Sequence, residues 1–201
     1  MIMNVPNSLT VGRIVIVFIF LLLANVSENT FFSANAVYII RVVAYILAII
    51  AGITDLLDGY IARKYNQVTD FGALMDPLAD KVFVTAAMLM MVEFDLMPAW
   101  IAVIVITREF LVTGLRMIAA QRGAVLKAEK SGKNKTFSQM VTIIVTLIGL
   151  AIRDDWFRFS PYGDRRFSRI VFGMMLITVA LTLWSGISYL WKNREVFLRD
   201  A

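Results

Sequence analysis

The chain has 201 residues, which is within the usual size of one domain, and no linker or low-complexity segment divides it. It is 59% hydrophobic and 17% charged, whereas a soluble domain is about half apolar and a quarter charged. This excess predicts an integral membrane protein. Neither cysteine nor histidine is present, which excludes disulfides, thiolate metal sites and the commonest general base. The net charge of +5 favours anionic headgroups or phosphorylated substrates over nucleic acid.

Six apolar stretches are each long enough to cross about 30 Å of hydrocarbon at roughly 1.5 Å per residue. The predicted fold class is therefore all-α, a polytopic membrane protein with six transmembrane helices in a single domain. Residues 1–8 are expected to form a surface segment that breaks at Pro6, with Asn7 or Ser8 as a helix cap. Residues 192–201 are expected to form a tail. The stretches run approximately over 9–26, 36–62, 71–92, 97–121, 136–152 and 169–191.

Basic residues are concentrated in alternate connections between these stretches. The connections at 63–70 and 122–135 and the tail carry Lys and Arg, whereas those at 27–35 and 93–96 carry only acidic charges. Because basic loops stay in the cytoplasm, both termini and the basic connections are assigned to the cytoplasmic side of a bacterial inner membrane. Residues 152–168 conflict with this assignment, since they place four arginines, diluted by three aspartates, on the outer side.

Four aspartates lie in or beside the second and third stretches, at Asp55, Asp58, Asp76 and Asp80. An ionised side chain at bilayer depth costs at least about 2.5–3.5 kcal/mol, so each requires a compensating partner. The spacings of three and four residues place each pair on one helical face. The short turn between the two stretches would then bring the two acidic faces together near the cytoplasmic side.

An all-oxygen cluster without histidine or cysteine suits Mg²⁺ or Mn²⁺, and two such ions are a recurring arrangement for in-line phosphoryl displacement. Gly59 and Gly72 would let a substrate approach the backbone. Arg63 could hold a phosphate by a bidentate contact. Two alternatives remain open: the aspartates pair with Arg63, Lys64 and Lys81, or they form a transport or proton pathway.

The two acidic segments read Asp55-Leu-Leu-Asp58-Gly59-Tyr-Ile-Ala62-Arg63 and Gly72-Ala-Leu-Met-Asp76-Pro-Leu-Ala-Asp80. Together they resemble the complete signature of the CDP-alcohol phosphotransferases. The resemblance implies a six-helix membrane fold, usually homodimeric, with a two-metal catalytic site open to the cytoplasm. It also implies transfer of a phosphatidyl-type group from a CDP-linked donor to an alcohol, with release of CMP.

The resemblance assigns roles to individual residues. The four aspartates would bind the metal ions, and Asp80 would also take the proton of the acceptor hydroxyl. The donor CDP-diacylglycerol would lie against Asn7, Thr10, Gly59, Ala62, Arg63, Thr69 and Gly72.

Segments 4–13, 76–81, 108–116 and 132–136 resemble the branch of this family that joins CDP-diacylglycerol to sn-glycerol 3-phosphate. Because that acceptor is a dianion, its site is expected where basic side chains meet. Arg108 and Arg116 are eight residues apart and share a helical face roughly. Lys133 and Lys135 precede the fifth stretch, where a helix N-terminus favours anions. Glu109 is an alternative partner for these cations, and headgroup contact is an alternative role for the lysines. Inositol phosphate, serine or phosphatidylglycerol are the alternative acceptors.

The last third of the chain carries no signature residue. Gly149, Gly173 and Gly186 are predicted to let neighbouring helices pack closely. Residues 152–168 are predicted to form an extended loop, with an aromatic part at 156–162 that would lie in the membrane interface.

Overall fold

The computed structural model describes residues 5–26, 31–64, 70–121, 130–156 and 161–194. Within these ranges the regular structure is entirely α-helical, which confirms the all-α part of the predicted class. Three helices contain segments long and apolar enough to cross a membrane, at Ala34–Ile53, Asn134–Ile152 and Arg165–Lys192. The six helices are α1 (Val5–Ala24), α2 (Ala34–Lys64), α3 (Asp70–Glu93), α4 (Ala99–Gln121), α5 (Lys130–Trp156) and α6 (Pro161–Lys192).

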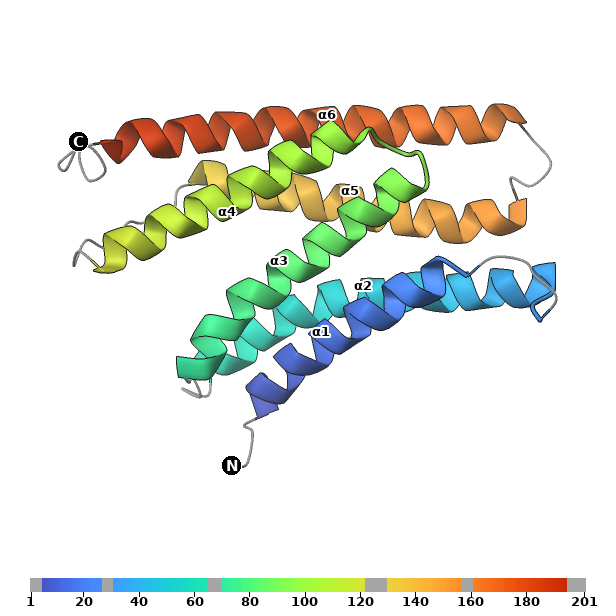
Figure 1. Cartoon of the computed structure of the whole chain (residues 1–201), viewed down its shortest axis with the longest axis horizontal. Helices are drawn as coiled ribbons and strands as arrows, with labels where there is room; N and C mark the ends of the chain where they lie inside the picture. Colours follow the sequence, from blue (N-terminus) through green and yellow to red (C-terminus); the bar gives the residue numbers. More distant parts are fainter. Residues whose placement is uncertain (1–4, 27–30, 65–69, 122–129, 157–160, 195–201) are drawn as a thin grey trace.

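The helices run back and forth along the bundle (Figure 1). The end of α2 and the start of α3 lie at the same end of the molecule as the end of α4, the start of α5 and the end of α6. Two groups of three are visible in the packing. Helix α1 packs on both α2 and α3, and α6 packs on both α4 and α5, while α2 against α5 and α3 against α4 join the groups.

Small residues make the first group compact. Ala44, Ala48 and Ala51 are fully buried on one face of α2, because their spacing of four and three residues returns them to the same side of a helix. Val17 and Phe20 of α1 are buried in the same cluster. Large apolar side chains elsewhere face outward, as a lipid-facing surface requires. They include Phe18, Leu22, Val103, Trp184, Ile187 and Trp191.

Several predicted helix boundaries are wrong, in each case because a polar turn continues the helix beyond its apolar stretch. Helix α1 begins at Val5, so Pro6 lies in the first turn, where proline is tolerated, and Asn7 and Ser8 are inside the helix instead of capping it. Residues 5–8 of the surface segment predicted at 1–8 are therefore helical, and residues 1–4 lie outside the described residues. Helix α5 begins at Lys130, which places Lys133 and Lys135 within its first turns.

The extended loop predicted at 152–168 is also wrong. Helix α5 continues to Trp156 and α6 begins at Pro161, so most of this segment is helical. Proline suits the first turn of a helix because its missing N–H would have no intrahelical partner there. Residues 157–160, which include part of the predicted aromatic stretch, lie outside the described residues.

The three glycines of the last third differ in their surroundings. A methyl group at Gly149 would overlap the ring of Phe167, so the close approach of α5 and α6 predicted there is confirmed. At Gly186 an added Cβ would lie 3.2 Å from Cγ of Arg108, which confirms close packing against α4. The same prediction is wrong for Gly173, where an added Cβ would meet nothing within 4 Å.

Candidate functional site

A cavity of about 640 Å³ lies between α3, α4 and α5 and reaches α2 at Gly52 and Ile53. Four predicted site residues line it, from three different helices: Asp80, Arg108, Arg116 and Lys135. The structure therefore brings the proposed base and three proposed phosphate-binding cations into one space. Its other polar lining residues are Lys81, Glu109, Thr113 and Thr136.

Helices α2 and α3 position the acidic signature. Asp55 and Asp58 belong to the last turns of α2, and Asp76 and Asp80 to the first turns of α3. The connection from Lys64 to Asp70 is short, as predicted, so both acidic pairs lie at the same end of the bundle (Figure 1). Helix α3 nevertheless packs chiefly on α1 and only slightly on α2.

Of the four predicted metal ligands, Asp80 is the one whose side chain the structure describes. Asp80 is half-buried and lines both the main cavity and a small adjoining one. Among the side chains that the structure describes, no three acidic groups come together. The side chains of Asp55, Asp58 and Asp76 lie outside that set, so the predicted metal cluster stays a prediction.

The predicted donor-binding residues are placed mainly by their backbone. Thr10 is described fully and is buried in α1. Thr69 lies outside the described residues. The others fall within helices, but their side chains are not among those described: Asn7 in α1, Gly59, Ala62 and Arg63 in α2, and Gly72 in α3. Lys133, a predicted acceptor residue, has the same status in α5.

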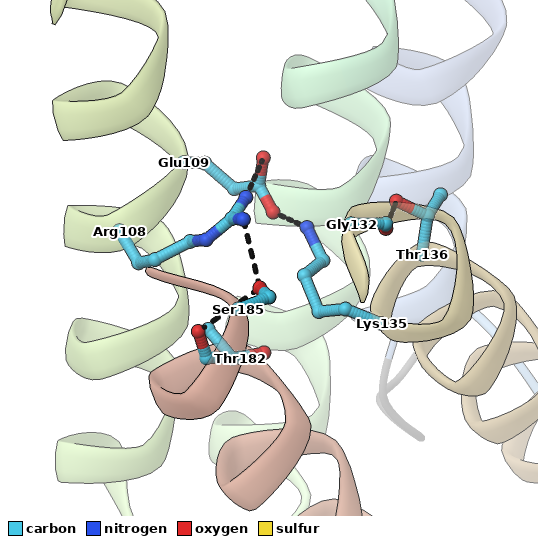
Figure 2. Close-up of polar contacts among 7 residues, drawn as sticks. All are labelled: Arg108, Glu109, Gly132, Lys135, Thr136, Thr182 and Ser185. Atoms are coloured by element: carbon cyan, nitrogen blue, oxygen red, sulfur yellow. Dashed lines mark hydrogen bonds and ion pairs between the residues drawn. The ribbon is translucent and has the colours of Figure 1, made fainter. Parts of the chain in front are cut away.

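Glu109 lies between two of the cations that line the cavity (Figure 2). Its carboxylate forms an ion pair with Nζ of Lys135, which is almost completely buried, and lies 3.8 Å from Nη1 of Arg108. A buried cation left without a partner is strongly destabilising. Glu109 is therefore a partner of Lys135 at the wall of the cavity, and the binding of an acceptor phosphate by Lys135 and Arg108 stays a prediction.

The two arginines of α4 are held by α6. Nη2 of Arg108 donates a hydrogen bond of 2.8 Å to Oγ of Ser185 (Figure 2). The guanidinium of Arg116 lies 5.4 Å from the centre of the Tyr189 ring, within the range of a cation–π contact. A similar contact places Nζ of Lys81 5.7 Å from the centre of the Phe110 ring.

The described part of the cavity lining carries an excess of positive charge. Its described lining contains four basic side chains, Lys81, Arg108, Arg116 and Lys135, against two acidic ones, Asp80 and Glu109. The balance of +2 matches a doubly charged anion such as a phosphate monoester.

Comparison with known proteins identifies the family. The profile of the CDP-alcohol phosphatidyltransferases matches residues 3–184, which is most of the chain. The chain belongs to the CDP-alcohol phosphatidyltransferase family. Together with the apolar helices, this membership makes it an integral membrane protein.

Individual members of the family resemble the chain over nearly its whole length. A protein of Bacillus subtilis (strain 168), named CDP-diacylglycerol–glycerol-3-phosphate 3-phosphatidyltransferase, is 41% identical over 196 residues, 96% of each chain. A protein of the same name from Haemophilus influenzae is 34% identical and covers 93% of this chain and 91% of its own. A probable phosphatidylglycerophosphate synthase of Mycobacterium tuberculosis is 34% identical over 92% of this chain and 79% of its own.

Sequence reasoning missed several residues that line this cavity or support its arginines. Thr113 precedes Arg116 by three residues, about one helical turn, and this spacing could have identified it. For Lys81 the sequence predicts only a partner for the aspartates. Ser185 and Tyr189 carried no signal, because neither belongs to the family signature and neither is charged.

Proposed function

We propose that the protein transfers the phosphatidyl group of CDP-diacylglycerol to sn-glycerol 3-phosphate, giving phosphatidylglycerophosphate and CMP in phospholipid biosynthesis. The observation that carries the proposal is the meeting of Asp80 with Arg108, Arg116 and Lys135 around one cavity. The names of relatives that are 34–41% identical describe this same transferase activity. The enzyme is therefore placed in the glycerol-3-phosphate branch of its family.

The acceptor phosphate is held by Arg108, Arg116 and Lys135, and Lys133 is proposed to assist from the first turn of α5. Two arginines and a lysine offer several charge-assisted hydrogen bonds to a phosphate monoester. Glu109 keeps Lys135 in place before the acceptor arrives. When the phosphate is bound to these groups, the C1 hydroxyl of glycerol 3-phosphate lies within the same cavity as Asp80.

Asp80 is the proposed general base. It accepts the proton of the C1 hydroxyl as that oxygen attacks the phosphorus that carries the diacylglycerol. The bond from this phosphorus to the oxygen of CMP breaks, and CMP leaves with that oxygen. A direct displacement is favoured because the chain has neither histidine nor cysteine, and no serine stands out as a covalent relay.

The donor is proposed to enter from the bilayer. The cavity continues along apolar side chains, among them Ile53, Phe137 and Ile144, and Ile53 and Phe137 are also exposed on the outer surface. This path suits a lipid whose acyl chains stay in the membrane. Its CDP group would lie against the donor-binding residues of α1, α2 and α3, including Gly59, Arg63 and Gly72.

Two divalent cations are proposed at Asp55, Asp58, Asp76 and Asp80. The donor set fits Mg²⁺ or Mn²⁺, because it contains only carboxylates and Asp80 lines the reaction cavity. When bound, such ions would neutralise the pyrophosphate and stabilise the departing CMP. The aspartates are proposed to hold them at the junction of α2 and α3.

The membrane arrangement is part of the same proposal. All six helices are proposed to span a bacterial inner membrane, with both termini and the active site toward the cytoplasm. The alternation of helix ends in Figure 1 supports this topology, as does the concentration of basic residues on one side. A homodimer is proposed from the family resemblance alone.

One experiment tests the activity and its acceptor. Purified protein with CDP-diacylglycerol and Mg²⁺ or Mn²⁺ is assayed for CMP with glycerol 3-phosphate, inositol phosphate, serine or phosphatidylglycerol. We expect release with glycerol 3-phosphate, none with serine, and loss of activity when EDTA removes the metal. Faster release of CMP with inositol phosphate would reassign the acceptor. If none of the four acceptors supports CMP release, a transport role would explain the aspartates better.

A further inference from the structure

One face of α6 contacts both arginines of the acceptor site. Ser185 accepts the hydrogen bond from Arg108, and its own hydroxyl donates to the carbonyl of Thr182 at 3.2 Å (Figure 2). Because the serine proton is directed to the backbone, a lone pair of Oγ points to the guanidinium. Ser185 is also almost completely buried, so water does not compete for this bond.

Gly186 shapes the space beside this hydrogen bond. A Cβ at position 186 would lie 3.2 Å from Cγ and 3.7 Å from Nε of Arg108. The first of these distances is shorter than ordinary van der Waals contact between carbon atoms. The missing side chain therefore makes room for the aliphatic stem of Arg108, while Ser185 holds its charged end.

Tyr189 lies one helical turn after Ser185 and supports the second arginine. Its ring is buried under the guanidinium of Arg116. Its hydroxyl is buried as well and has no hydrogen-bond partner among the described residues. The ring is thus the part of Tyr189 that contacts Arg116.

These contacts orient side chains that would otherwise be mobile. No described residue of α6 lines the cavity, yet α6 restrains two of its cations. Arginine loses considerable rotamer freedom when it binds a ligand. A protein that restrains the side chain beforehand binds the ligand more tightly, because less freedom is lost in the complex.

We propose that Ser185, Gly186 and Tyr189 form a seat on α6 that sets the positions of Arg108 and Arg116 for the phosphate of the acceptor. This inference rests on the proposed function, because it takes these two arginines as phosphate ligands. The three residues of the α6 seat are positioning residues. They act on the affinity for the anionic acceptor and leave binding of the CDP-linked donor unchanged.

The first test compares Gly186→Ala with Gly173→Ala, the same substitution on the same helix at a site where the added methyl meets nothing within 4 Å. We expect Gly186→Ala to raise KM for glycerol 3-phosphate about tenfold, the effect of weakening a charged hydrogen bond. KM for CDP-diacylglycerol and the thermal unfolding midpoint in detergent stay unchanged. Gly173→Ala alters none of these quantities.

The second test is a double-mutant cycle. Ser185→Ala is expected to raise KM for glycerol 3-phosphate in the native chain and to have no further effect in Arg108→Ala, because it acts only through that arginine. Tyr189→Phe, which keeps the ring, is expected to behave as the native protein, whereas Tyr189→Leu raises the same KM.

Distinct results would overturn the inference. A normal KM for glycerol 3-phosphate in both Gly186→Ala and Ser185→Ala overturns the seat, as do equal increases for both substrates. If Arg108→Ala raises this KM in the same experiment, the proposed function stands without the seat. A normal KM in both Arg108→Ala and Arg116→Ala would overturn the acceptor site and the seat together.

Discussion

Asp80 lies on α3 one helical turn after Asp76, and its side chain faces the cavity that also holds three proposed phosphate ligands. A carboxylate in this position can receive a proton from a hydroxyl bound beside it. Asparagine has nearly the same volume but cannot act as a base. Replacement of Asp80 by asparagine therefore tests its role in the reaction with little change in side-chain volume.

We expect Asp80→Asn to lower the rate of CMP release by at least about 100-fold, because the substitution removes the proposed general base and alters one proposed metal ligand. Thermal unfolding in detergent should stay near that of the native protein. Asp95→Asn is the matched control, because Asp95 is exposed outside the site at a φ of 54°, a conformation that asparagine also adopts. Near-normal turnover in Asp80→Asn would remove Asp80 as the base.

Arg116 offers a second prediction at the same scale. Arg116→Ala should raise KM for glycerol 3-phosphate about tenfold or more, because a hydrogen bond to a charged group contributes about 1.5–3 kcal/mol. KM for CDP-diacylglycerol should change little. Steady-state kinetics with each substrate varied in turn measures both values.

Arg194→Ala is the control for Arg116→Ala. Arg194 also lies over an aromatic ring, 5.0 Å from the centre of Trp191, but it is exposed just beyond the end of α6. Its removal should leave both KM values unchanged. Equal increases for the two substrates in Arg116→Ala would instead assign Arg116 a structural role.

The charged residues of the site could be predicted from sequence, because a charge inside an apolar stretch requires a partner or a function. This argument found Asp80, Arg108 and Arg116, and the structure brings them together. The α6 seat could not be found in the same way. Serine, glycine and tyrosine are common in membrane helices, and only the crossing of α4 and α6 gives Ser185 and Gly186 a neighbour to act on.

The contact between α5 and α6 depends on Gly149. Gly149→Ala should destabilise the protein by about 1–3 kcal/mol, since the added methyl would overlap the Phe167 ring and overpacking has this effect. Thermal unfolding in detergent measures the change, with Gly173→Ala as the control. An unchanged unfolding midpoint in Gly149→Ala would contradict the packing described for these helices.

Helix existence and order followed from apolar length, but helix ends did not. The apolar stretches end where polar residues begin, yet backbone hydrogen bonding continues through those residues in α5 and α6. Lys130 and Asp164 illustrate this, because both lie in helical turns beyond the apolar part. The hydrophobic pattern indicates where each helix would leave the hydrocarbon region of the membrane. It carries little information about where the helix itself ends.

The proposed membrane topology can be tested by labelling single cysteines in the full-length protein. The chain has no cysteine, so single cysteines can be introduced at Ser8, Asp95 and Arg166, all exposed. In sealed cells a membrane-impermeant maleimide should label positions 95 and 166 only. Position 8 should react only after the membrane is opened, because the N-terminus faces the cytoplasm in the proposed topology.

Position 166 is the most informative of the three. It lies in the arginine-containing segment that conflicts with the distribution of basic residues elsewhere. Labelling of position 166 from outside would support six spanning helices in the proposed order. Labelling of position 8 and not of position 95 in sealed cells would invert the topology and place the cavity at the outer surface.

In the proposed mechanism the signature residues and the acceptor ligands lie on different groups of helices. Helices α1 to α3 carry the signature, with the proposed metal and donor residues, whereas the proposed acceptor ligands come from α4 and α5 and are supported by α6. A lineage could therefore exchange one alcohol for another through changes in the second group while the first stays constant. In this proposal the signature that ends at Asp80 carries the group transfer, and residues of α4 to α6 select the acceptor.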